Sequence, residues 1–350
     1  MKVGLSYDLR DDYLAQGLTE EETAEFDRRD TVDSIDWTLQ DLGYKTDRIG
    51  NIKSLTSRLA DGDRWDMVFN IAEGLRGFGR EAQVPALLEA YDIPYTFSDP
   101  LVLSLSLHKA MAKHVMRDIG VPTADFVLIE READIETVDL TFPLFAKPVG
   151  EGTGKGINAA SKIKTRSDLM SVCCNLLKTY KQPVLVETFL PGREFTVGIV
   201  GSAEESRAIG TMEVILNPDA ERDVYSYVNK ERCEALVTYR LASDLAAKQA
   251  EAASLAAWKG LGCRDAGRID LRLDANGMPK VMELNPLAGL HPQHSDLCII
   301  ADKVGMTYRS LIEAIMESAL KRNGLGVAPL ASFQGVALKA FAANLQGMTT

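Results

Sequence analysis

The hydrophobic and polar positions of the chain follow two alternating periods, which predict strands that alternate with helices. Apolar runs of strand length occur at KVGLSY (2–7), DMVFNI (66–71) and IPYTF (93–97), and apolar positions recur with helical spacing near 30–43 and 81–91. Alternation of strands and helices is typical of an α/β fold. Residues 1–105 are therefore expected to form one βαβ domain.

The pattern beyond Pro100 predicts two further α+β units. In the unit at 106–190, a helix that carries Lys109 runs from Pro100 to Gly120, and strands alternate with a helix near 165–179. In the unit at 191–325, strands such as EFTVGIVG, RIDLRL and PKVMEL accompany helices near 243–261 and 307–321. The tail at 326–350 is rich in Gly and Ala, and its conformation is left open.

Composition narrows the class of protein. The 350 residues are 46% hydrophobic, which is enough for a sizeable core, and no apolar run has the length of a membrane span. A net charge of −11 disfavours binding to nucleic acid, and five cysteines without a CxxC pair favour reduced thiols. We expect a cytoplasmic protein that acts on small molecules, with neither nucleic acid nor membrane as a partner.

The glycine-rich stretch FPLFAKPVGEGTGKGI (142–157) matches neither familiar phosphate loop. It lacks the spacing and the final Ser or Thr of a Walker loop, and it does not follow the first strand of a βαβ unit as a dinucleotide fingerprint does. Two interpretations remain. One is an ordinary mobile hairpin, and the other is a flap whose amides, with Thr153 and Lys155, close over an anion near Lys147.

Acidic and amide side chains share one face of a predicted hairpin in AGRIDLRLDANGMPKVMELNPLAG. With a two-residue or a four-residue loop, Asp270 lies opposite Glu283 and Arg268 opposite Asn285. The opposite face then supplies the core, through Ile269, Leu271, Leu273, Met282 and Leu284. Two carboxylates and an amide suit Mg²⁺ or Mn²⁺. The alternative is a solvent-exposed face of salt bridges, with Arg268 and Arg272 balancing the acids.

With the flap and the hairpin together, the chain resembles the ATP-grasp ligases and, within them, the D-alanine–D-alanine ligase type. The resemblance covers roughly residues 65–320 and follows the order of motifs in that family. The motifs are IPYTFSDPLVLSLSLHK, FPLFAKPVGEGTGKG, VLVETFLPGREFTV, GRIDLRLD and VMELNPLAG.

The resemblance implies an ATP-grasp fold and a role for each matching residue. ATP would be bound by Lys109, Lys147, Thr153, Gly154, Glu187, Leu190, Glu194 and Lys230. Magnesium would be held by Asp270, Glu283 and Asn285, and the oxyanion of the intermediate would be stabilised by Arg268 and the amide of Gly289. The activity implied is ATP-dependent joining of a carboxylate to an amine through an acyl phosphate, in a possible homodimer.

The departures from the family concern the substrate. The Ser-x-Glu motif after the first strand is absent, and Asp8, Glu22 or Glu25 are its possible substitutes. Further candidate substrate contacts are Glu73, Arg80, His294 and Ser295. A zinc site at His291, His294 and Asp296 is disfavoured, because the family has none there. The alternatives are a ligase with another acceptor and a non-catalytic ATP-binding protein.

Overall fold

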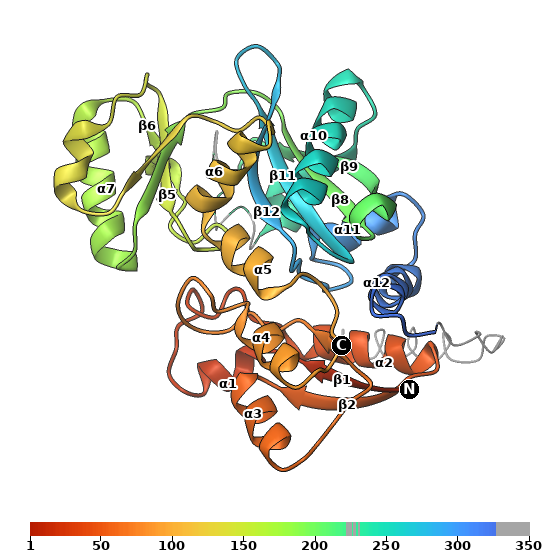
Figure 1. Ribbon diagram of the computed structural model, residues 1–350. Helices are drawn as coiled ribbons and strands as arrows, with labels where there is room; N and C mark the ends of the chain where they lie inside the picture. Colours follow the sequence, from red (N-terminus) through yellow and green to blue (C-terminus); the bar gives the residue numbers. More distant parts are fainter. Residues whose placement is uncertain (222–225, 227–228, 230–231, 327–350) are drawn as a thin grey trace, which may run out of the picture.

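The computed structural model of the chain contains three sheets with helices packed on their faces (Figure 1). It describes residues 1–326 apart from 222–225, 227–228 and 230–231. In Figure 1 the N-terminal sheet lies at the bottom, and the other two sheets lie above it on either side of helix α6. No helix within these described ranges combines the length and the apolar character needed to span a membrane.

The N-terminal sheet is parallel, in the order β2-β1-β3. Its strands are β1 (Lys2–Ser6), β2 (Lys45–Gly50) and β3 (Met67–Asn70), and its helices are α1 (Arg10–Leu14), α2 (Arg29–Asp41), α3 (Ile52–Ala60) and α4 (Gln83–Ala90). The expected strand at 93–97 forms only a bridge between Val68 and Tyr95. The extended chain ends there because Phe97 adopts a left-handed conformation, with φ of 70°.

The central sheet is antiparallel, in the order β4-β7-β5-β6. Its strands are β4 (Phe126–Ile129), β5 (Leu144–Pro148), β6 (Lys162–Ile163) and β7 (Val184–Thr188), with helices α5 (Pro100–Leu107), α6 (Lys109–Asp118) and α7 (Arg166–Tyr180) and 3₁₀ turns η1 (Glu132–Thr137) and η2 (Ala159–Ser161). The prediction of a single helix from Pro100 to Gly120 was wrong. His108 breaks it with ψ of 87°, and its ring accepts a hydrogen bond from the Met111 amide at the start of α6.

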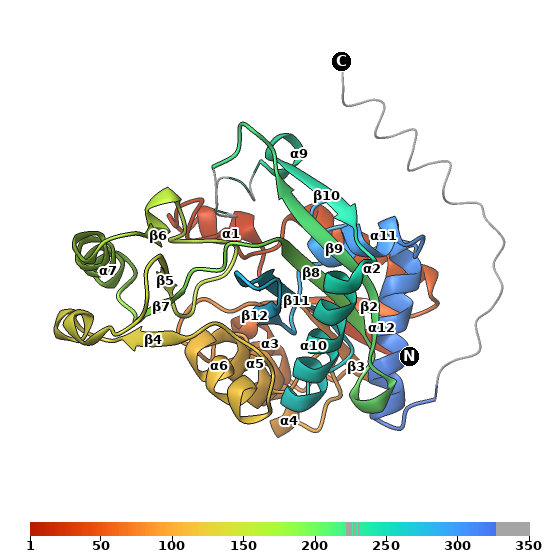
Figure 2. The same cartoon turned by 90° about the horizontal axis from the view of Figure 1, so that it is seen from above.

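The C-terminal sheet is antiparallel, in the order β10-β9-β8-β11-β12 (Figure 2). Its strands are β8 (Glu194–Val200), β9 (Arg207–Leu216), β10 (Val237–Leu241), β11 (Ala266–Leu273) and β12 (Pro279–Asn285). Its helices are α9 (Cys233–Leu236), α10 (Leu245–Leu261), α11 (Asp296–Lys303) and α12 (Tyr308–Arg322), with the 3₁₀ turn η3 (Ala203–Glu205). Trp258 of α10 is fully buried against this sheet.

One hydrophobic cluster joins the two ends of the described chain. Leu5 of β1 and Phe69 of β3 belong to the same buried cluster as Leu311 and Ile315 of α12. Figure 1 shows α12 beside α2, at the edge of the N-terminal sheet. The side chain of Asp265, fully buried, accepts hydrogen bonds from the Phe97 amide at 2.7 Å and from Arg322 of α12 at 2.9 Å. The N-terminal sheet is thus packed against the end of the C-terminal unit.

Candidate functional site

The β11–β12 hairpin places the predicted acids and amide on one face. Asp270 pairs with Glu283 and Arg268 with Asn285, as expected. The loop, however, has three residues, because the Asp274 amide donates to the Met278 carbonyl at 2.9 Å. A three-residue loop alone would place Glu283 and Asn285 on the opposite face of the hairpin from Asp270. A bulge between Asp270 and Leu271 returns them to the face of Asp270.

Because of the bulge, one of the predicted core positions was wrong. Met282 is only partly buried, and Val281 takes the core position expected for it, with no exposed surface. The other predicted core positions of the hairpin are buried. The acidic face therefore stays turned toward the central unit.

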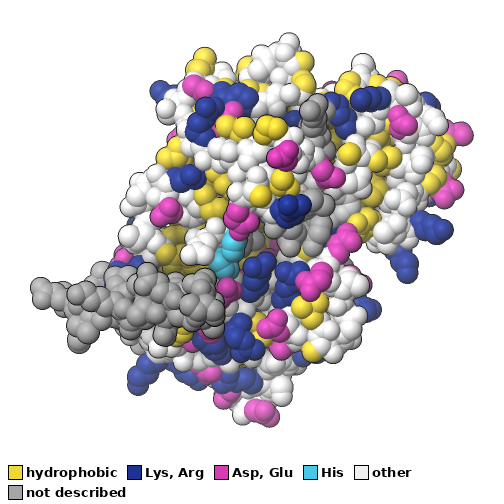
Figure 3. Space-filling model, turned by 180° about the vertical axis from the view of Figure 1, so that it is seen from behind, with side chains coloured by type: hydrophobic (Ala, Val, Ile, Leu, Met, Phe, Trp, Pro, Cys, Tyr) yellow, Lys and Arg dark blue, Asp and Glu magenta, His cyan; other side chains and the backbone are white. Residues whose placement is uncertain are grey.

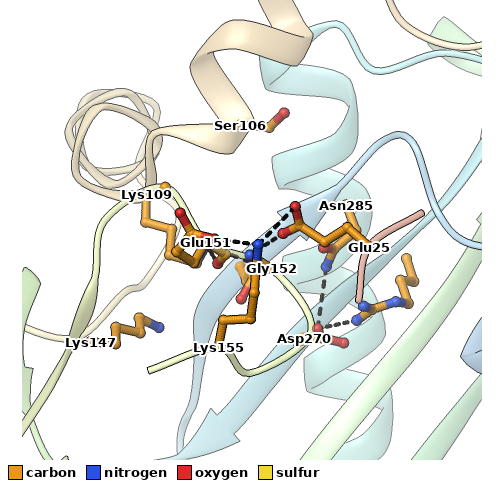
Figure 4. A network of polar contacts seen from close by, with 12 residues as sticks. Glu25, Ser106, Lys109, Lys147, Glu151, Gly152, Lys155, Asp270 and Asn285 are labelled. Atoms are coloured by element: carbon orange, nitrogen blue, oxygen red, sulfur yellow. Dashed lines mark hydrogen bonds and ion pairs between the residues drawn. The ribbon is translucent and has the colours of Figure 1, made fainter. Parts of the chain in front are cut away.

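Asp270 is the centre of the polar contacts on this face. Its carboxylate accepts hydrogen bonds from Thr196 at 2.9 Å and from the Asn285 amide at 3.2 Å, and it pairs with Arg268 (Figure 4). Arg268 also lies 3.6 Å from Asp296. Burial would lower the pKa of Arg268, but the two aspartates outweigh burial and raise it, which fixes the guanidinium as a permanent cation.

Two buried lysines of the central unit face this hairpin. Lys109 begins α6, and its Nζ lies 3.4 Å from Glu283 and donates to the Glu151 carbonyl at 2.6 Å. The Lys147 Nζ, on β5, lies 3.1 Å from Glu187. Burial lowers the pKa of Lys109, whereas Glu187 outweighs burial and raises the pKa of Lys147.

The glycine-rich flap folds back toward the N-terminal domain. Thr153 and Gly154 adopt left-handed conformations, with φ of 52° and 76°, and Thr153 lines the cavity described below. Lys155 is buried, 3.3 Å from Glu25 and paired with Glu151 (Figure 4). In this structure Lys155 therefore holds the flap closed through its ion pairs with Glu25 and Glu151.

Glu25 fastens the flap from the N-terminal side. Its carboxylate accepts a hydrogen bond from the Gly152 amide and pairs with Arg80 at 3.0 Å, while Arg80 also donates to the Gly150 carbonyl at 2.9 Å. Burial would raise the pKa of Glu25, but Arg80 and Lys155 outweigh it and lower the pKa. The predicted substrate contact Arg80 is thus engaged by the flap.

The expected nucleotide hinge lies at the end of β7. Glu187 and Leu190 are buried, and Glu194, at the start of β8, lies 3.6 Å from Arg272. Burial would raise the pKa of Glu187, but Lys113 and Lys147 hold it at about 2. Lys230, the lysine expected from the lid loop, lies outside the described residues.

A cavity of about 380 Å³ separates the flap from the hairpin. It brings together most of the predicted catalytic, metal and substrate residues, which are Arg268, Gly289, Glu283, Asn285, Glu73, His294 and Ser295. Two of the predicted ATP contacts, Lys109 and Thr153, also line it. Figure 3 shows histidine at a recess of the surface, with acidic and basic side chains around it. His294 pairs with Glu234 at 2.9 Å, and the Ser295 hydroxyl accepts from the His291 amide at 2.8 Å. Among the described residues, no group of three His, Cys, Asp or Glu side chains is placed to hold a metal ion.

The N-terminal wall of the cavity is acidic. Glu73 and Glu81 both line it. Burial, together with the charge of Glu81, raises the pKa of Glu73 well above its ordinary value, and burial raises the pKa of Glu81 to about 8 despite Arg80. A cationic group that enters this side of the cavity would favour the ionised form of both carboxyls.

Sequence reasoning missed Lys113, considered Asp296 only for a zinc site and not as a partner of Arg268, and left Glu25 among alternatives. The structure distinguishes the three candidate substitutes for the missing Ser-x-Glu motif. Asp8 is buried and accepts from the Gly74 amide at 2.8 Å, and Glu22 is exposed, whereas Glu25 lines the cavity. Lys113 follows Lys109 by one helical turn, and that spacing was the available signal.

Comparisons with known proteins identify the family of the chain. Residues 115–317, more than half of the chain, match the family model "D-ala D-ala ligase C-terminus". The chain is 33% identical over 310 residues to an uncharacterised protein of Sinorhizobium fredii, covering 84% of this chain and 89% of that protein. It is also 33% identical over 262 residues to a D-alanine–D-alanine ligase of Bordetella petrii, covering 73% and 76%.

The fold is also found among solved structures. The D-alanine–D-alanine ligase from Bacillus anthracis complexed with ATP aligns with a TM-score of 0.68 at 21% identity, covering 93% of this chain and 99% of that one. This likeness confirms the predicted ATP-grasp fold. The family model and the identity to curated relatives together show that the chain belongs to the D-alanine–D-alanine ligase family.

Proposed function

We propose that the protein is an ATP-dependent ligase that joins a carboxylate to an amine through an acyl phosphate and releases ADP and phosphate. One observation carries the proposal. The buried Lys109 ammonium group of the central unit lies 3.4 Å from the Glu283 carboxylate of the β11–β12 hairpin, and both line a cavity that the flap borders. A cation for phosphate and an oxygen donor for a metal ion thus lie side by side at this cavity.

The ATP contacts follow from the chemistry of each side chain. Lys109 and Lys147 are compact point charges for phosphate, and the flap amides near Thr153 and Gly154 are further donors. A carboxylate accepts from an amino group or from ribose hydroxyls, which suits Glu187 and Glu194, and Leu190 supplies apolar surface for the base.

The donor set on the hairpin fits a hard divalent cation. Asp270 and Glu283 are paired across the strands, and Asn285 adds an amide oxygen on the same face. Magnesium held there would offset negative charge on the transferring phosphoryl group.

The remaining groups serve the two chemical steps. The substrate carboxylate attacks the γ-phosphorus, ADP leaves, and the amine then displaces phosphate from the acyl phosphate. Arg268 and the Gly289 amide, both in the cavity wall, stabilise the oxyanion of the tetrahedral intermediate. The closed flap excludes water, which would hydrolyse the acyl phosphate.

The relatives suggest D-alanyl-D-alanine as the first product to test. A ligase with another acceptor is the second candidate, and the acidic wall of Glu73 and Glu81 favours it, because two carboxyls there suit a cationic group on the acceptor. The expected cellular setting is the cytoplasm, with small-molecule substrates and a homodimeric assembly.

The test is an ADP-release screen with Mg²⁺-ATP and a panel of D- and L-amino acids, singly and in pairs, with products identified by mass. We expect turnover on at least one pair, its loss in Asp270→Asn, and a decrease of roughly 10²–10³-fold in Arg268→Ala, as for loss of an oxyanion donor. Binding of ATP without turnover on any carboxylate would exclude the ligase.

A further inference from the structure

A second lysine of α6 is more deeply buried than Lys109 and Lys147. Lys113 has no exposed surface and lies one helical turn after Lys109. An ammonium group removed from water is strongly unfavourable unless it is paired and hydrogen-bonded. Its position inside the fold therefore depends on specific partners.

The partners of Lys113 come from both ATP-grasp sheets. Its Nζ donates to the Thr123 hydroxyl at 2.5 Å and to the Val281 carbonyl of β12 at 3.3 Å, and it lies 2.9 Å from the Glu187 carboxylate of β7. Thr123 also donates to the Val281 carbonyl, at 2.8 Å. Val281 precedes Glu283 by two residues on the same strand. Lys113 thus ties the hinge strand to the strand of the proposed metal site.

Glu187 is shared between two ammonium groups. One carboxylate oxygen lies 2.9 Å from Lys113 and the other 3.1 Å from Lys147. When a phosphate draws Lys147 away, Glu187 would be left buried with no counter-charge unless Lys113 stayed beside it. The carboxylate therefore needs a second cation for Lys147 to be released.

We propose that Lys113 is a positioning residue for ATP: it neutralises Glu187, which frees Lys147 to contact the phosphates, and it holds β7 and β12 in register. The inference rests on the proposed ligase function. Lys113 itself touches neither the phosphates nor the substrate, and its effect is transmitted through Glu187 and Lys147.

The decisive measurement is the affinity of the full-length protein for Mg²⁺ and the non-hydrolysable β,γ-imido analogue of ATP, by titration calorimetry. In Lys113→Met we expect an affinity about tenfold or more weaker, because Glu187 then retains Lys147. The KM for ATP rises in parallel, while the KM for the carboxylate substrate stays the same. An affinity within twofold of the wild type would overturn the proposal.

A double-mutant cycle separates this role from a purely structural one. When Glu187→Gln is added to Lys113→Met, the retaining charge is gone, so the two changes should be strongly non-additive in nucleotide affinity. Additive losses would contradict the proposal. Lys178→Met makes the same substitution at an exposed lysine of α7 and should bind as the wild type does.

Two further measurements distinguish loss of the Lys113 charge from misfolding and from failure of the proposed function. Lys113→Gln keeps a donor for Thr123 and Val281 but removes the charge, so it should show the same loss of affinity even if Lys113→Met does not fold. Nucleotide affinity in Lys113→Gln equal to that of the wild type would overturn the inference. Failure of the wild type to bind the nucleotide would instead overturn the proposed function.

Discussion

The contacts of Glu25 predict that one carboxylate keeps the flap closed. The perturbation is Glu25→Gln, which keeps the shape of the side chain and removes its charge. In the closed flap this charge pairs with Arg80 at 3.0 Å and with Lys155 at 3.3 Å, and it accepts from the Gly152 amide. The side chains of Glu25, Arg80 and Lys155 are each about nine-tenths buried.

The expected magnitude follows from that burial. Removal of one partner of a buried ion pair costs about 3 kcal/mol or more, because the remaining charge is left without compensation. Since the Lys155 contact exists only when the flap is closed, most of this cost falls on the closed state. A cost of about 3 kcal/mol corresponds to roughly a 150-fold larger open population.

Hydrogen exchange of the flap amides measures this population. The Lys155 amide donates to the Gly152 carbonyl and the Ile157 amide to the Gly154 carbonyl, each at 3.0 Å, so both exchange when the flap opens. We expect exchange roughly 100-fold faster in Glu25→Gln. Glu22→Gln, an exposed acid of the same loop, should leave the rates unchanged. Rates within threefold of the wild type in Glu25→Gln would refute the reasoning.

Three further predictions concern stability, measured by urea unfolding. The pKa of Glu187 is lowered to about 2, so its contribution is complete above about pH 4.5 and is lost as pH falls toward 2. The difference in unfolding free energy between the wild type and Glu187→Gln should shrink from pH 6 to pH 3, and a constant difference would contradict this. In Gly267→Ala the new methyl group would lie 2.5 Å from the Asn285 carbonyl oxygen, which predicts a loss of about 1–3 kcal/mol. Gly79→Ala, with only a 3.5 Å contact, is its control, and equal stabilities of the two variants would argue against overpacking. Asp265→Ala leaves Arg322 without its buried partner and should lower the free energy of unfolding by about 3–5 kcal/mol. A decrease under 1 kcal/mol would contradict this, because it would show that the Arg322 charge does not depend on Asp265.

Side-chain parity explains why the hairpin face could be predicted. Because side chains alternate along a strand, the order of Asp270, Glu283 and Asn285 fixed their common face for either assumed loop. The bulge and the three-residue loop could not be predicted, since their effects on parity cancel. Met282 was assigned to the core for that reason.

Other features depended on contacts between distant segments. Lys113 and Glu25 resemble ordinary surface charges in the sequence, and their burial arises from partners such as Val281 and Gly152, more than a hundred residues away. The break at His108 was missed because the apolar spacing continues across it. The domain boundaries and the roles of the site residues stay predictions.

The shared cluster of Leu5, Phe69, Leu311 and Ile315 has a consequence for the order of folding during synthesis. The first strand emerges from the ribosome early, but α12, whose apolar side chains belong to the same cluster, is made some three hundred residues later. Until then, the apolar surface that α12 covers is exposed. A nascent chain that stalls before residues 308–322 should therefore bind chaperones, and release of α12 should bury the surface and complete the N-terminal domain.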